Sequence, residues 1–294
     1  MRKIRDYGSI LLAAVLWGCA ALTVNLLGDV GASNQEILFV RAATSTVVMA
    51  IWIMLTDRKL FKIRLRDIWI FFGQGVLGYA CTNLTYFTCI RTCSMGTAAA
   101  LMYLAPAVVA VLSVPVFKEK LTPTKAVSAS LVLLGAACTA GIFHGGGQYP
   151  VSGLLAGVLC GIVYGLYSMF GRISVGRYHV LTANFYSFGL ATLFVFPMMP
   201  MEEALAHAAQ PKMLGALVLA AVLCCTLPYL LYTMALRNVP ASAATVVSSL
   251  EPAVAALLGW AVYNESLGAD KIIGIGLIIL AVAISTIKPK ENTV

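Results

Sequence analysis

The sequence predicts an all-α protein that crosses a membrane many times. Of its 294 residues, 60% are hydrophobic and only 11% are charged, whereas an average soluble domain has about 25% charged residues. The apolar residues also gather in ten runs, each close to the roughly 20 residues that a helix needs to cross a bilayer core. These observations exclude a soluble domain, a disordered chain and a disulfide scaffold.

The ten runs follow one another with short connections, which leave no room for a domain outside the membrane. The first run follows three basic residues and continues past Cys19 to Leu27, so it predicts an uncleaved helix and not a signal peptide. The seventh run is closed by Pro197 and Pro200. In order, the expected helices are 8–27, 35–55, 68–89, 96–116, 124–142, 151–171, 180–199, 212–235, 241–263 and 271–288.

The basic residues predict how the chain is oriented. If the N-terminus lies in the cytoplasm, 16 of the 20 Lys and Arg residues fall in cytoplasmic segments, and only Arg91, Lys212 and Lys271 fall outside. Short cytoplasmic loops carry such an excess of Lys and Arg, and nine spans would break the pattern. We therefore expect a multi-pass protein of the cell membrane with both termini cytoplasmic, and we attribute the net charge of +8 to topology and not to nucleic-acid binding.

The eight cysteines indicate neither metal nor redox chemistry. Seven lie inside apolar runs and Cys93 lies just after one, with no CxxC pair and no histidine cluster nearby. We interpret them as small packing residues. The sequence predicts no metal site and no cofactor.

The two halves of the chain resemble each other at an offset of 146 residues. The aligned pairs include Tyr86 with Tyr232, Arg91 with Arg237, Leu104 with Leu250, Pro106 with Pro252, Glu119 with Glu265 and Lys125 with Lys271. Apolar composition alone would not align Tyr, Arg, Pro, Glu and Lys in one register. Each half, about 8–142 and about 151–288, has five expected spans, and an odd number inserts the second half in the opposite direction. The sequence thus predicts one transmembrane domain, 1–294, made of two inverted five-helix repeats, which is typical of transporters with a substrate site near the midplane.

These features resemble the drug/metabolite transporter superfamily in its ten-helix EamA-type branch. The residues that carry the resemblance are Trp17-Gly18, Arg41, the stretch from Leu104-Ala105-Pro106 to Glu119-Lys120-Leu121, and its repetition from Leu250-Glu251-Pro252 to Glu265-Ser266-Leu267. The resemblance covers nearly the whole chain. It implies ten helices around a central cavity and transport of small organic solutes, including amino acids, often outward. Ala105 stands where the second half has Glu251, so the first half offers no symmetric acid.

The sixth expected helix carries a glycine at every fourth position. Gly153, Gly157, Gly161 and Gly165 lie along one helix face, where small residues let another backbone approach closely. We expect a tight helix contact there, and a contact that slides during transport is compatible with it.

Pro106 and Pro252 lie inside the fourth and ninth expected helices at matching repeat positions. Proline bends a helix interior because it lacks a backbone donor. One intramembrane proline is common, but paired interruptions at corresponding positions indicate a transporter binding site. The structural and functional interpretations are equally open.

Glu251 is the one acidic residue deep inside an expected span. A carboxylate there is costly, which favours a functional role, either in coupling proton movement to transport or in binding a cationic group of the substrate. The structural alternative is a neutral acid bonded to a neighbouring hydroxyl, or a pair with Arg41. Arg41 is only about 9 Å into its span at 1.5 Å per residue, so we expect its side chain to extend outward to the membrane surface.

Polar and aromatic side chains in the middle of several expected helices predict a central pocket. Tyr79, Asn83 and Tyr86 share one helix face, and lipid would penalise Asn83, so this face should point inward. The residues expected to border the pocket are Trp17, Tyr79, Asn83, Tyr86, Tyr164, Tyr232, Ser248 and Glu251. By contrast, Glu119 and Glu265 at helix ends are expected to be solvated caps, and His207 is expected in a loop.

The sequence therefore predicts a secondary transporter of a small organic metabolite. No ATP-binding motif is present, so a gradient must supply the energy. An intramembrane enzyme would need clustered catalytic side chains, and a channel would show filters built from repeated subunits; an enzyme and a structural membrane protein are the alternatives. The expected partners are a small-molecule substrate and the lipid bilayer, with no nucleic acid. The fold does not define the substrate.

Overall fold

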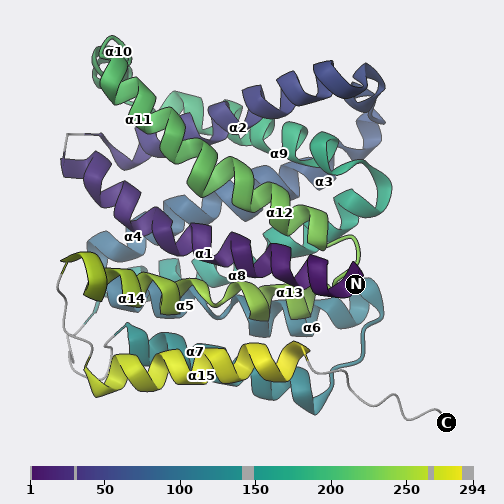
Figure 1. Ribbon diagram of the computed structural model, residues 1–294, viewed down its shortest axis with the longest axis vertical. Coiled ribbons are helices and arrows are strands. Elements are labelled where there is room, and N and C mark those ends of the chain that lie inside the picture. Colours follow the sequence, from purple (N-terminus) through teal and green to yellow (C-terminus); the bar gives the residue numbers. More distant parts are fainter. Residues whose placement is uncertain (1, 30–31, 141–148, 264–267, 287–294) are drawn as a thin grey trace.

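The computed structural model describes residues 2–29, 32–140, 149–263 and 268–286. Within these residues the all-α class is confirmed, since every element is a helix. The long helices lie side by side as a bundle, and their axes run across the view of Figure 1. All ten expected runs are occupied by helix in the described residues.

The first half of the chain contains the helices of the first five expected runs. They are α1 (Arg2–Asp29), α2 (Asn34–Thr56), α3 (Ile68–Phe72), η3 (Gly73–Cys81), α4 (Thr82–Thr92), α5 (Met95–Met102), α6 (Ala105–Phe117) and α7 (Pro123–Thr139). Two short 3-10 turns, η1 (Arg58–Phe61) and η2 (Leu65–Asp67), connect α2 to α3. The segments α3, η3 and α4 follow one another without a break.

The second half contains the helices of the last five expected runs. They are α8 (Val151–Arg177), α9 (Val180–Val195) with η5 (Phe196–Met198), α11 (Pro211–Ala221) with η6 (Val222–Thr226) and α12 (Leu227–Ala235), α13 (Ala241–Ser248), α14 (Glu251–Tyr263) and α15 (Ala269–Thr286). A short helix that the hydropathy pattern did not predict, α10 (Met201–Ala208), connects α9 to α11.

Seven helical stretches among the described residues are long and apolar enough to cross a membrane. They are Asn34–Thr56, Met95–Phe117, Val151–Arg177, Val180–Met198, Pro211–Ala235, Ala241–Val262 and Ala269–Thr286, with Pro123–Thr139 as a shorter apolar helix. Large apolar side chains also cover the outside of the bundle, for example Leu55 at 80% and Leu193 at 72% exposure. Lipid is the natural solvent for such a surface, so the chain is a multi-pass membrane protein.

Each half has one interrupted helix, and the two interruptions are at matching positions. The chain leaves α5 after Met102 and enters α6 before Pro106, and it leaves α13 after Ser248 and enters α14 before Pro252. A proline cannot donate to the carbonyl four residues earlier, and those carbonyls belong to the last residues of α5 and α13. The missing hydrogen bonds explain where both helices end.

A second paired irregularity is π-helical. At the 146-residue offset, residues 222–226 of η6 correspond to residues 76–80, which lie within η3. Such π segments widen the helix locally and are frequent at functional sites. Both segments face the centre of the bundle, where Tyr79 and Cys225 are buried.

The glycine face of α8 makes the tight contact that its spacing predicts. A Cβ added at Gly161 would lie 2.5 Å from the carbonyl oxygen of Leu101, and one added at Gly157 would collide with the Leu101 side chain. Gly153 approaches Thr92 in the same way. Only glycine allows α8 to approach α4 and α5 this closely.

Candidate substrate site

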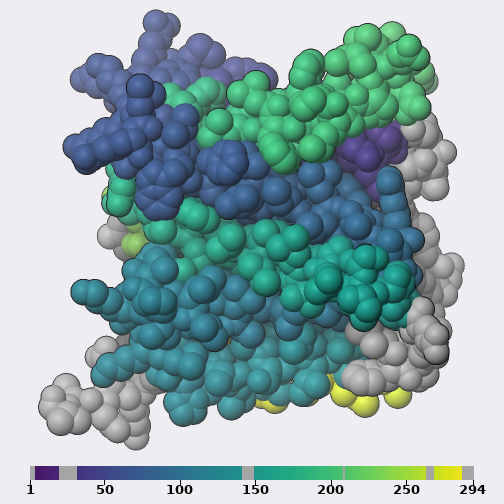
Figure 2. All heavy atoms as spheres, turned by 180° about the vertical axis from the view of Figure 1, so that it is seen from behind, coloured from purple at the N-terminus to yellow at the C-terminus, as the bar shows by residue number. Residues whose placement is uncertain are grey.

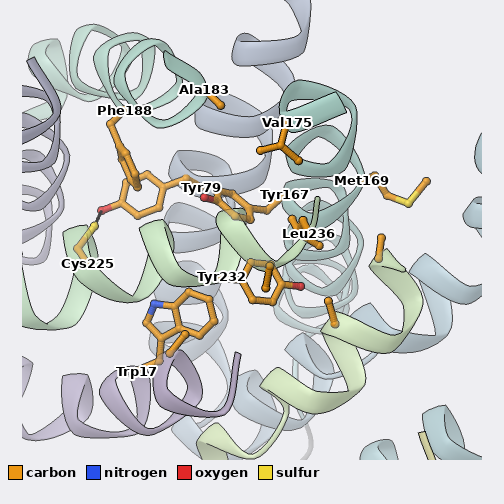
Figure 3. Close-up of a cluster of buried hydrophobic side chains, with 14 of the residues drawn as sticks. Trp17, Tyr79, Tyr167, Met169, Val175, Ala183, Phe188, Cys225, Tyr232 and Leu236 are labelled. Atoms are coloured by element: carbon orange, nitrogen blue, oxygen red, sulfur yellow. Dashed lines mark hydrogen bonds between the residues drawn. The ribbon is translucent and has the colours of Figure 1, made fainter. Parts of the chain in front are cut away.

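Aromatic side chains from both halves of the chain meet at the centre of the bundle. Trp17 of α1 contacts Tyr229 and Tyr232 of α12, with ring centroids 4.9 and 5.4 Å apart. Tyr79 of η3 and Tyr167 of α8 contact Tyr229 from other sides, at 5.4 and 4.9 Å. Figure 3 shows Trp17, Tyr79, Tyr167 and Tyr232 gathered around one centre. Three of the side chains expected in the pocket, Trp17, Tyr79 and Tyr232, thus belong to one cluster.

Tyr229 contacts the most rings in this cluster, although it was not among the residues expected to border the pocket. It also contacts Phe188 of α9, at 5.4 Å. Its spacing of three residues from Tyr232 places both rings on one helix face, and this was the available signal. A lone tyrosine in a membrane helix carries no such signal by itself.

Hydrogen bonds hold the tyrosines of the cluster in place. The Tyr232 hydroxyl lies 2.7 Å from the Ser168 hydroxyl, and the Tyr167 hydroxyl lies 3.0 Å from that of Thr233. Trp17 is 7% exposed, and unlike these hydroxyl groups its indole N–H has no hydrogen-bond acceptor among the described residues. A buried donor without an acceptor costs about 1–3 kcal/mol, so an acceptor placed beside this N–H would stabilise Trp17.

Arg41 does not extend outward, so that expectation is wrong. Its guanidinium donates a hydrogen bond to the carbonyl oxygen of Cys224, at 2.9 Å. Cys224 lies in η6, where the π-helical turn departs from the regular i to i−4 ladder and turns carbonyls toward other donors. This partly buried hydrogen bond gives the guanidinium an acceptor inside the bundle, and it brings the cation close to Tyr79 and Tyr229.

Glu251 begins α14 and faces the inside of the bundle. The side chains around it are Tyr103, Tyr164 and Tyr86, with Arg41 within electrostatic range. Tyr103, which is 2% exposed, was not selected from the sequence. Glu251 is partly exposed, as are Tyr164 and Tyr86. The carboxylate therefore borders the central region beside several phenol groups that can donate to it.

The two remaining residues of the expected pocket, Ser248 and Asn83, lie in different surroundings. Ser248 is buried, and its hydroxyl donates to the carbonyl of Thr245 at 3.0 Å, while its side chain also lies beside Tyr164 and Tyr232. Asn83 is half-buried, and in the described residues its amide donates only to the Tyr79 carbonyl of its own helix, at 2.8 Å. Ser248 thus links the Glu251 region to the aromatic cluster, whereas the hydrogen bond of Asn83 stays within its own helix.

Glu119 is not a solvated cap, and that expectation is wrong. Its carboxylate accepts hydrogen bonds from Lys125 at 2.7 Å, from Ser242 at 2.8 Å and from Arg172. Lys118 adopts a left-handed conformation with φ of 54°, which ends α6 and turns Glu119 back toward the bundle. Burial raises the pKa of Glu119, but the bonds from Lys125 and Ser242 and the charges of Lys125 and Arg172 outweigh it and lower the pKa. Glu265, its repeat partner, lies outside the described residues.

His207 lies in α10 and not in a loop, which corrects the sequence expectation. Its Nδ1 atom is 2.9 Å from Oε2 of Glu36, a carboxylate that is 1% exposed at the start of α2. The pattern of hydropathy gave no sign of this pair, because the two residues are far apart in the sequence. The contact ties α10 to the first turn of α2.

Comparison with known proteins identifies the family of this chain. Residues 7–141 and residues 151–287 each match the EamA-like transporter family. The chain belongs to this family. The two matched segments cover both halves that the internal repeat defined, so the family domain occurs twice in the chain.

Several proteins named as transporters or exporters match this chain over most of their length. The threonine/homoserine exporter RhtA of Escherichia coli K12 is 27% identical over 288 residues, which cover 97% of this chain and 92% of RhtA. An uncharacterized transporter of Archaeoglobus fulgidus is 22% identical over 94% of this chain and 96% of its own, and YwfM of Bacillus subtilis is 24% identical over 96% and 94%. A solved crystal structure with 17% identity superposes with a TM-score of 0.78 over 96% of both chains, which shows a shared fold.

Proposed function

We propose that this EamA-family protein is a secondary transporter that moves a small amino-acid-like metabolite across the cell membrane by alternating access. Membership of a transporter family supports transport as the general function. The substrate class rests on the site, and it agrees with the name of the relative RhtA, a threonine/homoserine exporter.

The observation that carries this proposal is the pairing of one acid and one base at the aromatic centre. Glu251 and Arg41 lie within electrostatic range of each other, next to Tyr229. An amino acid carries an ammonium and a carboxylate, which match Glu251 and Arg41, and tyrosine faces attract an ammonium. The indole N–H of Trp17, for which no described residue is an acceptor, offers a further donor for a substrate carboxylate.

The transmembrane arrangement that we propose has ten spans in two inverted five-helix repeats, with both termini in the cytoplasm. The two family matches support the repeat, and the 16 of 20 basic residues in alternate connections support the orientation. The paired interruptions before Pro106 and Pro252 flank the centre, as expected for a site between inverted repeats.

Alternating access requires helices that can change their contacts without unfolding. The glycine face of α8 packs against the backbone and the Leu101 side chain of α5, and a contact made by such small residues is compatible with sliding during transport. The interrupted helices α5–α6 and α13–α14 supply the points where each half can bend. We propose that these two features let the centre open to one side of the membrane at a time.

We propose that Glu251 couples this motion to proton movement. A carboxylate in a closed, dry site favours the neutral form, and access to water favours ionisation. If proton affinity differs between the two open states, protonation and conformation are linked by necessity. The alternative role is direct pairing with the ammonium of the substrate.

Replacing Glu251 with glutamine in proteoliposomes distinguishes these roles. Coupling predicts that Glu251→Gln still exchanges threonine or homoserine across the membrane but no longer accumulates it under a pH gradient. Pairing predicts weaker binding of these amino acids at every pH. The exposed Glu202→Gln is the matched control and should transport like the parent. If Glu251→Gln also transports, accumulates and binds like the parent, Glu251 is structural.

The same vesicles test the alternatives to transport. Saturable flux with no chemical change in the solute supports a transporter. Conversion of the solute would indicate an intramembrane enzyme, and flux that does not saturate would indicate a channel. Absence of flux for all metabolites of a broad library would favour a structural membrane protein.

A further inference from the structure

We propose that a basic pocket at one end of the bundle binds the phosphate headgroup of an anionic phospholipid. The pocket has a volume of about 590 Å³, and it lies between the segment that connects α2 to α3 and the end of α8. Four cationic side chains line it, namely Lys62, Arg64, Arg66 and Arg177, with Asp67 as the one acid. The pocket is separate from the aromatic centre and takes no part in the proposed transport step.

Hydrogen bonds give this pocket a fixed wall. Asp67 is 5% exposed, and it accepts hydrogen bonds from the Tyr178 hydroxyl at 2.6 Å and from Arg177 at 2.8 Å. The backbone N–H of Arg64 donates in turn to the Tyr178 oxygen, at 3.2 Å. These bonds join the connecting segment to the end of α8. The bond from Tyr178 and the charges of Arg177 and Arg66 also lower the pKa of Asp67, so it stays ionised at neutral pH.

Asp67 compensates only part of the positive charge around the pocket. Its carboxylate is paired with Arg177, whereas Lys62, Arg64 and Arg66 form no salt bridge with any described residue. Three exposed cations held around one concave space repel each other, and a bound anion relieves that repulsion. Arginine also matches the geometry of phosphate oxygens with two parallel N–H donors. The chemistry of the lining therefore selects a phosphate.

The neighbouring side chains favour a lipid as the source of this phosphate. Leu65 is 80% exposed between Arg64 and Arg66, and Ile68 and Trp69 at the start of α3 are 44% and 49% exposed. Figure 2 shows the blue segment after α2 projecting from the bundle at this end. Exposed apolar groups beside cations, with a tryptophan among them, are typical of the membrane interface. Acyl chains can lie along this apolar surface while the headgroup enters the pocket, and anionic lipids are drawn to such clusters.

Topology alone does not require this arrangement. The tendency of cytoplasmic loops to be positive needs only basic residues in the loop. Here a buried carboxylate also fixes Arg177 of another helix onto the same pocket. The volume lies within the range of about 300–1,000 Å³ that small-molecule pockets occupy.

The experiment is a lipid titration of the purified full-length protein in detergent, with bound lipids counted by native mass spectrometry. The pocket variant is Lys62→Gln/Arg64→Gln/Arg66→Gln. The control removes the same charge from exposed positions that do not line the pocket, as Arg58→Gln/Lys59→Gln/Lys120→Gln. We expect the pocket variant to bind the first, most tightly held phosphatidylglycerol molecule on the order of a hundredfold more weakly than the parent does. This corresponds to a loss of affinity of about fivefold for each of the three cations removed. The control should bind it like the parent, and phosphatidylcholine should bind equally to all three.

Two results would overturn the proposal. If the pocket variant and the control lose equal affinity for phosphatidylglycerol, overall charge and not the pocket attracts the lipid. Displacement of phosphatidylglycerol by inorganic phosphate at millimolar concentration would assign the pocket to a soluble phosphate. Retention of the lipid against inorganic phosphate, together with loss in the pocket variant alone, supports the lipid site.

Discussion

Replacing Glu119 with glutamine should loosen the connection between the two halves of the protein. Glu119 follows α6 in the first half, and its carboxylate bonds to Arg172 of α8 and Ser242 of α13 in the second half, as well as to Lys125 of α7. The Arg172 guanidinium also lies 4.6 Å from the centre of the Phe117 ring. Glutamine keeps the size of the side chain but removes the charge that draws both cations.

The size of the effect follows from the exposure of the three side chains. Glu119 is 11% exposed, Lys125 24% and Arg172 30%. An exposed ion pair contributes about 0–1 kcal/mol, whereas breaking a buried pair costs about 3–5 kcal/mol. Glu119 lies between these limits, and solvent screens both cations in part. We expect Glu119→Gln to reduce the free energy of unfolding by about 2 kcal/mol.

The assay is thermal unfolding of the purified protein in detergent at neutral and at acidic pH. At neutral pH, Glu119→Gln should lower the unfolding temperature by about 5 °C. The folded protein lowers the pKa of Glu119 below its ordinary value of 4.5, so the carboxylate stabilises the fold fully above that pH. This stabilisation is lost as the pH falls through the lowered pKa. The difference in unfolding temperature between the parent and Glu119→Gln should therefore become smaller below pH 4.5.

The exposed Glu202→Gln serves as control, since it makes the same charge change at the start of α10. It should leave the unfolding temperature unchanged. If both variants lower the unfolding temperature equally, or if Glu119→Gln does not lower it at neutral pH, Glu119 does not connect the two halves. A gap that does not narrow in acid would show that the carboxylate charge is not the cause.

Two further predictions concern packing and orientation. Gly161→Ala places a methyl group 2.5 Å from a carbonyl oxygen of α5 and should lower the unfolding temperature. Gly215→Ala, whose added Cβ has nothing within 4 Å, should leave the unfolding temperature unchanged or raise it, because alanine favours a helix over glycine by about 1 kcal/mol. Equal effects of the two substitutions would refute the close contact at Gly161. Single cysteines in a cysteine-free protein, labelled with a membrane-impermeant thiol reagent, should react from outside near His207 and be protected near Lys120, because the basic residues place these segments on opposite sides. Protection near His207 together with reaction near Lys120 would reverse the proposed orientation.

The helices were predictable because hydropathy and capping act locally. The second run was expected at 35–55, and α2 spans Asn34–Thr56, with the Ser33 side chain accepting a hydrogen bond from the Glu36 N–H. The sixth helix was expected to end at 171, yet α8 continues to Arg177. Bilayer thickness limits the apolar run, but backbone hydrogen bonds continue into polar residues beyond it. The short helix α10 was missed because it has too few residues for a span.

The contacts of the candidate site were less predictable, since they depend on which helices become neighbours. Glu251 was selected because an intramembrane carboxylate is costly wherever it lies. Arg41 and Glu119 were misjudged, because long side chains can turn outward or inward and the sequence does not show which acceptor is near. Tyr103 and Tyr229 were missed for a related reason: their partners come from helices that are far away in the sequence.

The chain repeats some features in both halves and carries others once, and this difference supports the proposed alternating access. The interruptions before Pro106 and Pro252 and the π segments η3 and η6 occur once in each half. In the proposed mechanism, two halves that bend at equivalent places exchange conformations, which would open the centre first to one side of the membrane and then to the other. The charged side chains at the centre occur once: at the same offset Glu251 corresponds to Ala105, and Arg41 corresponds to Ser187. Because the exchange of conformations does not duplicate or remove these charges, one acid and one base would face the substrate in both states, as the proposed transport of a zwitterionic solute requires.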